Sequence, residues 1–305
     1  LNEFIIMNRK IWIYLSVFIF LTTACKSLSR KEKIAETTQN SLLWKVEGKT
    51  LKKPYYIYGT LHLFCKNDWK IYDPVKAALD SSEYLVLEMK DAGSPENLTK
   101  IYSLAIMGDG KTLSNLLSEK EFDEIGSWYK NNLGIDLYTF QAFHPMIISS
   151  LLITKYFDCS PESGVDMELE EYAKEHDIKL LGLETAEEQI KFLMELDPVK
   201  SAKSLYHNIH EFDKSKKYFA ELYQNYIDEK LIREDLINDK NDPSAEEFTE
   251  HLLIKRNNNW VQKINGFSRE SSHFIAVGAA HLSGKNGLIN LLRKNGYKLT
   301  AIPIK

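Results

Sequence analysis

Two short motifs, one near each end of the sequence, place a histidine three residues after a glycine. The segment GTLH at 59–62 follows the apolar run YYIY, and the segment GAAH at 278–281 follows FIAV. A glycine directly after a strand permits a sharp turn or the close approach of a ligand. The repeated pattern therefore predicts that His62 and His281 leave the ends of buried strands and point into a crevice.

Two carboxylates occupy the matching place after other apolar runs. Glu88 follows YLVL, and Glu184 follows KLLGL. If the four runs are mostly parallel strands, both histidines and both glutamates meet at the carboxyl edge of one sheet. Such a set could hold a divalent ion such as Zn²⁺, Mn²⁺ or Co²⁺ that activates water, or could act directly as general base and acid. The spacing does not choose between these chemistries, and a purely structural role at the sheet rim is a further interpretation.

The elements that position these side chains follow from the apolar pattern. Short apolar runs predict strands at Leu43–Val46, Tyr55–Tyr58, Tyr84–Leu87, Lys179–Leu183, Phe274–Val277 and Lys298–Ile304. Strands that are apolar throughout indicate a sheet covered on both faces, and helical patterns separate them. The predicted fold class is therefore α/β, with a central mixed, mostly parallel sheet flanked by helices. In the domain 42–305, the core comprises residues 42–90, 179–190 and 270–305, and helical segments at 95–160 and 191–265 form a cap.

Several helix boundaries can be read from the sequence. One helix is predicted over 112–130, and another over 137–157 that Pro145 kinks or divides. Thr185 opens a further helix with a capping box. His273 lies among polar residues and is predicted to be at the surface.

The N-terminal residues have the pattern of a bacterial secretory signal. Basic residues follow Met7, which we expect to be the initiator, and an apolar run of 14 residues, too short for a membrane span, occupies 11–24. Residues 1–24 are predicted to be a lipoprotein-type signal peptide, with Cys25 lipidated and 25–41 a flexible tether. The alternative is ordinary cleavage with Cys25 incidental. The expected location is the bacterial cell envelope, with the protein lipid-anchored at the membrane surface.

The other two cysteines, Cys65 and Cys159, allow either a disulfide or two unrelated buried thiols. Export favours the disulfide, because oxidising compartments preserve such bonds.

The composition is globular and excludes one class of partner. Of 305 residues, 44% are hydrophobic and 27% are charged, and the net charge is −4. No basic face is indicated, so nucleic-acid binding is not expected.

The chain resembles the TraB/GumN/PrgY family, whose animal relatives include the Tiki ectodomains. The similarity rests on the motifs IYGTLH, LVLEM, LLGLETAEEQ, RNNNW and VGAAHLSGKNGLINLLRKNGY. The resemblance implies an α/β core related to the erythromycin-esterase and ChaN-like folds. For Tiki-like members it also implies metal-dependent proteolysis, which carries over to His62, His281 and Glu88 here.

Three further residues lie at family positions with less defined roles. Glu184 is expected to be a metal ligand or a partner of a ligand. Arg256, in RNNNW, could bind an anionic group of the substrate. Asp166, in the segment GVD, is also assigned to substrate binding by the resemblance.

The function expected from these observations is that of a membrane-tethered, metal-dependent hydrolase that acts on a peptide or a small molecule, with a peptide favoured. His62 and His281 would hold the metal, and Glu88 would ligate it or act as general base. The alternative is a non-catalytic surface protein that binds or sequesters a peptide or small ligand in the same crevice.

Overall fold

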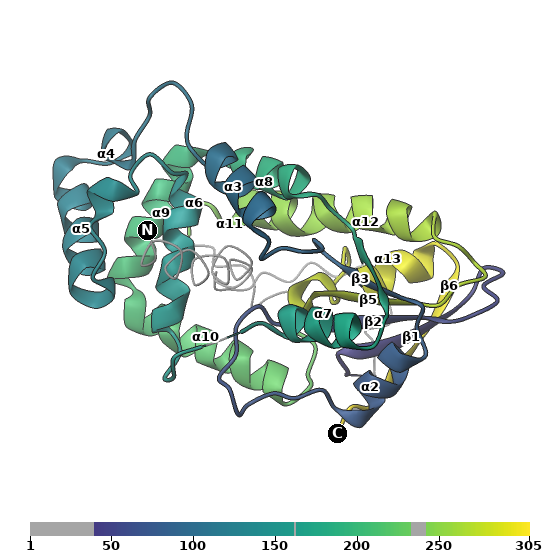
Figure 1. The fold of residues 1–305 in the computed structure, drawn as a ribbon. Helices are drawn as coiled ribbons and strands as arrows, with labels where there is room; N and C mark the ends of the chain where they lie inside the picture. The colour runs from purple at the N-terminus through teal and green to yellow at the C-terminus, as the bar shows by residue number, and fades with distance from the viewer. Residues whose placement is uncertain (1–39, 162, 233–241) are drawn as a thin grey trace, which may run out of the picture.

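The structure is a computed structural model that describes residues 40–161, 163–232 and 242–305 (Figure 1). The predicted signal peptide, Cys25 and the part of the predicted tether before residue 40 lie outside the described residues. In the described part of the chain, no helix is both long enough and apolar enough to cross a membrane.

Six strands form one sheet in the order β4-β3-β5-β2-β1-β6. Neighbouring strands among β4, β3, β5 and β2 pair in parallel, whereas β1 is antiparallel to both of its neighbours. The predicted α/β class, with a mixed and mostly parallel sheet, is confirmed. The strands span β1 Leu43–Gly48, β2 Tyr55–Thr60, β3 Tyr84–Leu87, β4 Lys179–Gly182, β5 His273–Gly278 and β6 Tyr297–Ile302.

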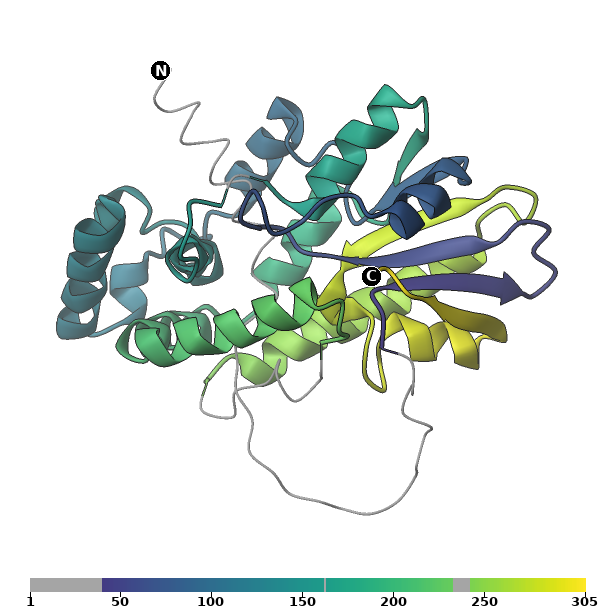
Figure 2. The same ribbon diagram turned by 90° about the horizontal axis from the view of Figure 1, so that it is seen from below.

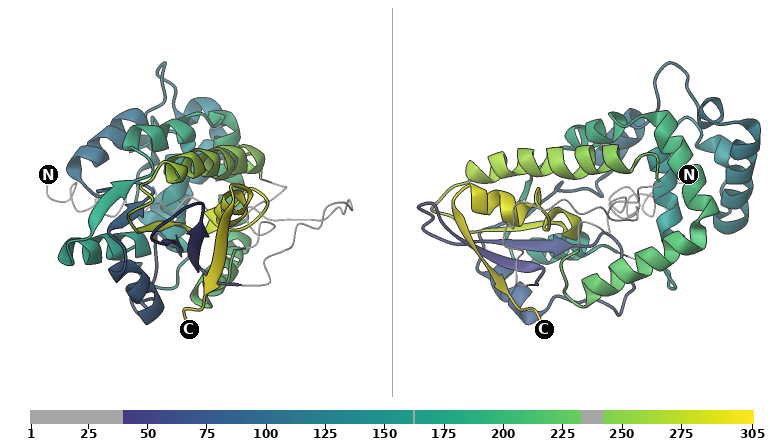
Figure 3. Two further views of the ribbon diagram at one scale, coloured as in Figure 1. Left: turned by 90° about the vertical axis from the view of Figure 1, so that its right-hand side faces the viewer. Right: turned by 180° about the vertical axis from the view of Figure 1, so that it is seen from behind.

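Helices cover both faces of this sheet. On one face lie α12 (Arg256–Asn265) and α13 (Leu288–Lys294), and on the other lie α2 (Asp73–Asp80) and α7 (Val165–Glu175) (Figures 1 and 3). Because successive strand residues point to opposite faces, every position of a central strand meets a helix layer. This explains why the strand sequences are apolar throughout.

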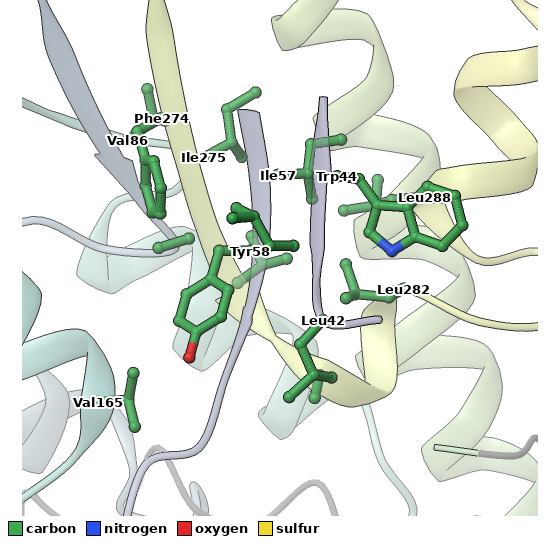
Figure 4. Packing of buried hydrophobic residues seen from close by; sticks show 14 of the residues in the cluster. Leu42, Trp44, Ile57, Tyr58, Val86, Val165, Phe274, Ile275, Leu282 and Leu288 are labelled. Carbon is green, nitrogen blue, oxygen red and sulfur yellow. The ribbon is translucent and has the colours of Figure 1, made fainter. Parts of the chain in front are cut away.

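The packing around β2 shows both layers. Tyr58 lies on the side of Val165, whereas Ile57 lies on the side of Trp44 and Leu288 (Figure 4). All five side chains are fully buried in one apolar cluster. Each side chain of this size contributes roughly 1.5–3 kcal/mol of burial free energy, so the sheet is a rigid support for groups at its edge.

A helical block lies beyond the ends at which the parallel strands finish (Figures 1 and 2). It contains α4 (Leu113–Leu116), α5 (Glu119–Leu133), α6 (Pro145–Ser150) and α9 (Pro198–His210). These helices share a second apolar core, which also takes in Leu63 from the segment after β2. The other helical segments are α3 Pro95–Leu104, η1 Leu137–Thr139, η2 Leu151–Lys155, α8 Ala186–Met194, α10 Phe212–Ile227, α11 Ala245–Phe248, η4 Thr249–Lys255 and η5 Ala279–His281.

The structure divides both of the long helices predicted in this block. The prediction of one helix at 112–130 is wrong, because Leu117 is extended and Ser118 starts a new helix by forming a capping box with Glu121. Pro145 does divide the second predicted helix: it occupies the first turn of α6.

The prediction that His273 lies at the surface is also wrong. Only 2% of His273 is exposed, and its ring stacks on Tyr84 and on Phe267, with centroid distances of 4.9 and 4.7 Å. Its polar neighbours in the sequence conceal that it is the first residue of β5.

His144 caps α6 with a ring nitrogen in place of the usual side-chain oxygen. Its Nδ1 accepts the Met146 N–H at 3.3 Å, and its Nε2 lies 3.2 Å from the Leu196 carbonyl oxygen. Burial lowers the pKa of His144 from 6.5 to about 4. The folded protein therefore keeps this ring neutral at a pH where the unfolded chain would protonate it.

We expect His144 to make the protein sensitive to acid. Between pH 6.5 and about 4 the unfolded chain binds a proton that the folded chain does not, so the unfolding free energy falls as the pH falls. The loss across this window is about 3 kcal/mol. His144→Asn keeps a capping acceptor that does not titrate, so urea unfolding from pH 7 to 4 should show a shallower loss of stability. The exposed His176→Asn variant is the control, and an unchanged slope in His144→Asn would contradict this assignment.

Candidate active site at the carboxyl ends of the parallel strands

The predicted site residues follow three adjacent parallel strands. His62, Glu88 and His281 come within three residues of the ends of β2, β3 and β5. The register places Thr60 beside Gly278 and Leu87 beside Ala276, so the three strands finish at nearly the same level. The sheet therefore delivers these side chains to one edge, as the sequence predicts.

Arg256 lies at the centre of this edge and joins the two glutamates. Its Nη2 donates to Glu88 Oε2 at 2.6 Å and to Glu184 Oε2 at 2.8 Å, and its Nε lies 3.0 Å from Glu184 Oε1. Trp260, one turn along α12, donates its indole N–H to Glu184 Oε1 at 2.8 Å. Both carboxylates and the guanidinium are less than 10% exposed. Arg256 therefore serves as an internal cation that holds two buried acids together.

The two carboxylates have opposite pKa shifts around the one arginine. Burial raises the pKa of Glu184 despite its contacts with Arg256. Burial also acts to raise the pKa of Glu88, but the charge of Arg256, the neighbouring imidazoles of His281 and His62, and the N–H of Gly278 lower it to about 2. That N–H donates to Glu88 Oε1 at 2.8 Å. Glu88 is therefore an anion at neutral pH.

His62 has one ring nitrogen fixed and the other free. Its Nδ1 lies 3.2 Å from Asp166 Oδ1, whereas its Nε2 is buried and has no hydrogen-bond partner among the described residues. Burial opposes a charge on the ring, but the Asp166 carboxylate, through its charge and its hydrogen bond, and the charge of Glu88 together raise the pKa of His62. An unsatisfied buried nitrogen is costly, and it is typical of a position that a ligand completes.

The backbone explains how His62 and Asp166 meet. The Phe64 N–H donates to the Ser163 carbonyl at 3.1 Å, and the Val165 N–H donates to the Leu61 carbonyl at 2.8 Å. Gly164 lies between these contacts, and a Cβ there would stand 2.5 Å from the His62 carbonyl oxygen. A glycine is required because the two segments approach too closely for a side chain.

The predicted disulfide is present beside this pairing. Cys65 and Cys159 are bonded and connect the segment after His62 to the segment before Asp166. Tyr223 adds a further tie, because its hydroxyl accepts the Cys65 N–H at 2.9 Å. Disulfides of this kind are typical of exported proteins.

His281 is the more deeply buried histidine, with no exposed surface. Its Nδ1 lies 2.7 Å from Asn257 Oδ1, and its Nε2 lies 3.4 Å from Arg256 Nη1 and 3.8 Å from Glu88 Oε1. Burial lowers its pKa to about 3, so the ring is neutral at physiological pH.

The structure thus joins four of the predicted site residues through direct contacts, namely Glu88, Glu184, Arg256 and His281. His62 lies near enough to act on the pKa of Glu88 and of His281, and it contacts Asp166. The sequence analysis assigned no role to Asn257, Trp260 or the Gly278 N–H. Asn257 and Trp260 belong to the RNNNW motif, where they follow Arg256 by one residue and by one helical turn. That spacing on one helix was the available signal.

The side-chain types at this edge are ones that bind divalent ions. Two imidazole Nε2 atoms and the Glu88 carboxylate are the types of ligand that Zn²⁺, Mn²⁺ and Co²⁺ use, and the unsatisfied Nε2 of His62 is suited to a metal bond. Both oxygens of Glu184 are engaged by Arg256 and Trp260. Each oxygen of Glu88 also accepts a hydrogen bond, Oε2 from Arg256 and Oε1 from the Gly278 N–H. Across residues 40–161, 163–232 and 242–305, no group of three or more His, Cys, Asp or Glu side chains is arranged so that it could hold a metal ion.

A surface groove of about 810 Å³ lies elsewhere, on the helical block, and is lined by residues of α5 and α9 that include Glu124, Trp128 and His210. It contains none of the predicted site residues. The groove is therefore separate from the chemistry at the sheet edge.

A mostly parallel sheet that carries two histidines and a carboxylate–arginine–carboxylate cluster at its carboxyl edge defines an α/β protein with a buried polar site. The chain belongs to the TraB/PrgY/gumN family, which matches residues 42–301.

Two relatives carry the name of a metalloprotease. The chain is 24% identical over 327 aligned residues to the "Metalloprotease TIKI homolog" of Amphimedon queenslandica, covering 88% of this chain and 62% of that protein. It is 36% identical over 59 residues to "Metalloprotease TIKI2" of Xenopus tropicalis, covering 18% of this chain and 11% of that protein. The chain thus spans less than two thirds of the length of either relative. No solved structure matches.

Proposed function

We propose that the protein is a metal-dependent hydrolase that cleaves peptides at the carboxyl edge of its sheet. The observation that carries the proposal is the buried, unsatisfied Nε2 of His62, at the same sheet edge as His281 and the Glu88 anion and near enough to influence the pKa of both. The metalloprotease names of the two relatives favour a peptide substrate.

In this proposal His62 and His281 hold the ion through their Nε2 atoms. A bound divalent ion would acidify a water molecule and polarise the scissile carbonyl. Asp166 and Asn257 orient the two imidazoles, and Arg256 with Glu184 fixes the Glu88 carboxylate.

The pKa of Glu88 separates its two expected roles. A general base works best when its pKa lies near the operating pH. With a pKa of about 2, Glu88 is a weak proton acceptor but a permanent negative charge. We therefore assign Glu88 to the ligand set rather than to proton abstraction.

The site is most accessible to solvent at the start of α7. The side chain of Asp166 is 21% exposed, and Met167 is 41% exposed, whereas the two histidines and Glu88 are buried. We propose that the substrate approaches from this side and that Asp166 contacts it.

We also propose that a lipid on Cys25 anchors the protein in the bacterial cell envelope, where its substrates would be.

Peptide cleavage in the presence of Zn²⁺, Mn²⁺ or Co²⁺, followed by mass spectrometry of the products, tests the proposal. We expect His62→Ala, His281→Ala and Glu88→Gln each to lower the rate by about 10²-fold or more, because each removes a group at the reacting centre. The exposed His176→Ala variant should keep full activity.

Two results would contradict the proposal. Wild-type cleavage rates in both histidine variants would show that His62 and His281 take no part in catalysis. Saturable binding of peptide without any product, tolerant of Glu88→Gln, would indicate a binding protein instead.

A further inference from the structure

We propose that Asn257 is a positioning residue that holds His281 in the Nδ1–H tautomer, so that Nε2 presents its lone pair to the site. The Gly-x-x-His motif places the ring but does not determine which nitrogen carries the proton. The functional consequence of this inference rests on the proposed hydrolase, whereas the tautomer itself can be measured without it.

The orientation of the Asn257 amide is fixed by two backbone carbonyls. Its Nδ2 donates to the Asn286 carbonyl at 2.9 Å and lies 3.3 Å from the His281 carbonyl. Carbonyl oxygens only accept, so the NH₂ group must face them and Oδ1 must face the other way. Because Asn257 is only 2% exposed, water has little access to replace these bonds.

The amide orientation then determines the proton on His281. Asn257 Oδ1 lies 2.7 Å from His281 Nδ1. An amide oxygen can only accept, so Nδ1 carries the hydrogen and the neutral ring has its lone pair on Nε2.

The opposite side of the ring agrees with this assignment. His281 Nε2 faces Arg256 Nη1 at 3.4 Å, and a guanidinium is a donor without any acceptor. Glu88 Oε1 lies at 3.8 Å, beyond hydrogen-bond distance. A hydrogen on Nε2 would therefore meet a cation and gain no acceptor.

His62 is held in a similar way from a different element. Its Nδ1 lies against Asp166 of α7, and its Nε2 has no partner in the described part of the chain. Two residues that are distant in the sequence, Asn257 and Asp166, thus turn the same nitrogen of each histidine toward the site. Partners of this kind fix the tautomer of metal-binding histidines, and their loss typically weakens metal binding by 10- to 100-fold.

The test is the tautomer of His281, read from long-range ¹⁵N–¹H correlations of the full chain labelled at its histidines. Wild type should show Nδ1–H. Asn257→Leu has a similar size but no acceptor, so we expect loss of the pure Nδ1–H state and at least tenfold weaker binding of Zn²⁺ alone by calorimetry. Asn257→Asp restores an oxygen acceptor and should keep Nδ1–H. Asn258→Leu changes the exposed neighbour and should change neither readout.

The inference is overturned if His281 of the wild type carries its hydrogen on Nε2. It is also overturned if Asn257→Leu melts at a lower temperature but retains the Nδ1–H tautomer, since Asn257 would then be only structural. An Nδ1–H tautomer in a wild type that binds no Zn²⁺ would support this assignment and contradict the metal-dependent function.

Discussion

Replacing Arg256 with leucine should destabilise the protein by about 3–5 kcal/mol, because two buried carboxylates would lose the cation that compensates them. Nε and Nη2 of Arg256 bond to Glu184, and Nη2 also bonds to Glu88. The variant should also lose activity, since Glu88 would no longer be held at the site. Urea unfolding at pH 7 measures the change in stability.

A double-mutant cycle separates this cluster from ordinary ion pairs. Adding Glu184→Gln to Arg256→Leu should recover part of the loss, because one uncompensated charge disappears. Lys263→Leu is the control on the same helix, since Lys263 bonds outside the cluster, to the exposed Glu188 at 3.0 Å and to the Leu183 carbonyl at 2.5 Å. It should cost at most about 1 kcal/mol. Equal losses of unfolding free energy in Arg256→Leu and Lys263→Leu would show that the buried cluster contributes no more to stability than an exposed ion pair.

Removing the disulfide with Cys65→Ala and Cys159→Ala should lower the unfolding free energy by about 4 kcal/mol, because the bond closes a long loop in the unfolded chain. The bonded residues are 94 positions apart. Peptide cleavage should weaken as well, since the bond ties the His62 segment to the segment that carries Asp166.

Reductant provides the control for this pair. It should lower the melting temperature of the wild type to that of the double variant and leave the double variant unchanged. Non-reducing mass spectrometry should find the peptides of Cys65 and Cys159 joined. Free thiols at both positions in the untreated protein would contradict the assignment.

The sheet and its edge were predictable because their signals are local. Apolar runs ending in Gly59 and Gly278 mark strands whose side chains are buried on both faces, and the following histidines emerge where those strands end. Glu88 and Glu184 could be placed by the same reasoning. The capping box at Ser118 is an equally local signal. The sequence SEKE has the pattern of a capping box, which marks the start of a new helix at Ser118.

The connections between side chains were not predictable, because they depend on contacts between distant segments. His273 is buried by Tyr84 and Phe267, which its own polar neighbours do not reveal. Arg256 was expected to bind an anionic substrate group, but its described contacts are to internal acids. The role of Asn257 depends on a histidine 24 residues away.

The central claim is that His62, His281 and Glu88 belong to one metal site. Anomalous diffraction from crystals of the full chain soaked in Zn²⁺ tests it most directly. The account predicts a single strong peak within bonding distance of Nε2 of both histidines and of a Glu88 oxygen, and its loss in crystals of His62→Ala. A zinc peak at some other place, with both Nε2 atoms bare, would contradict it.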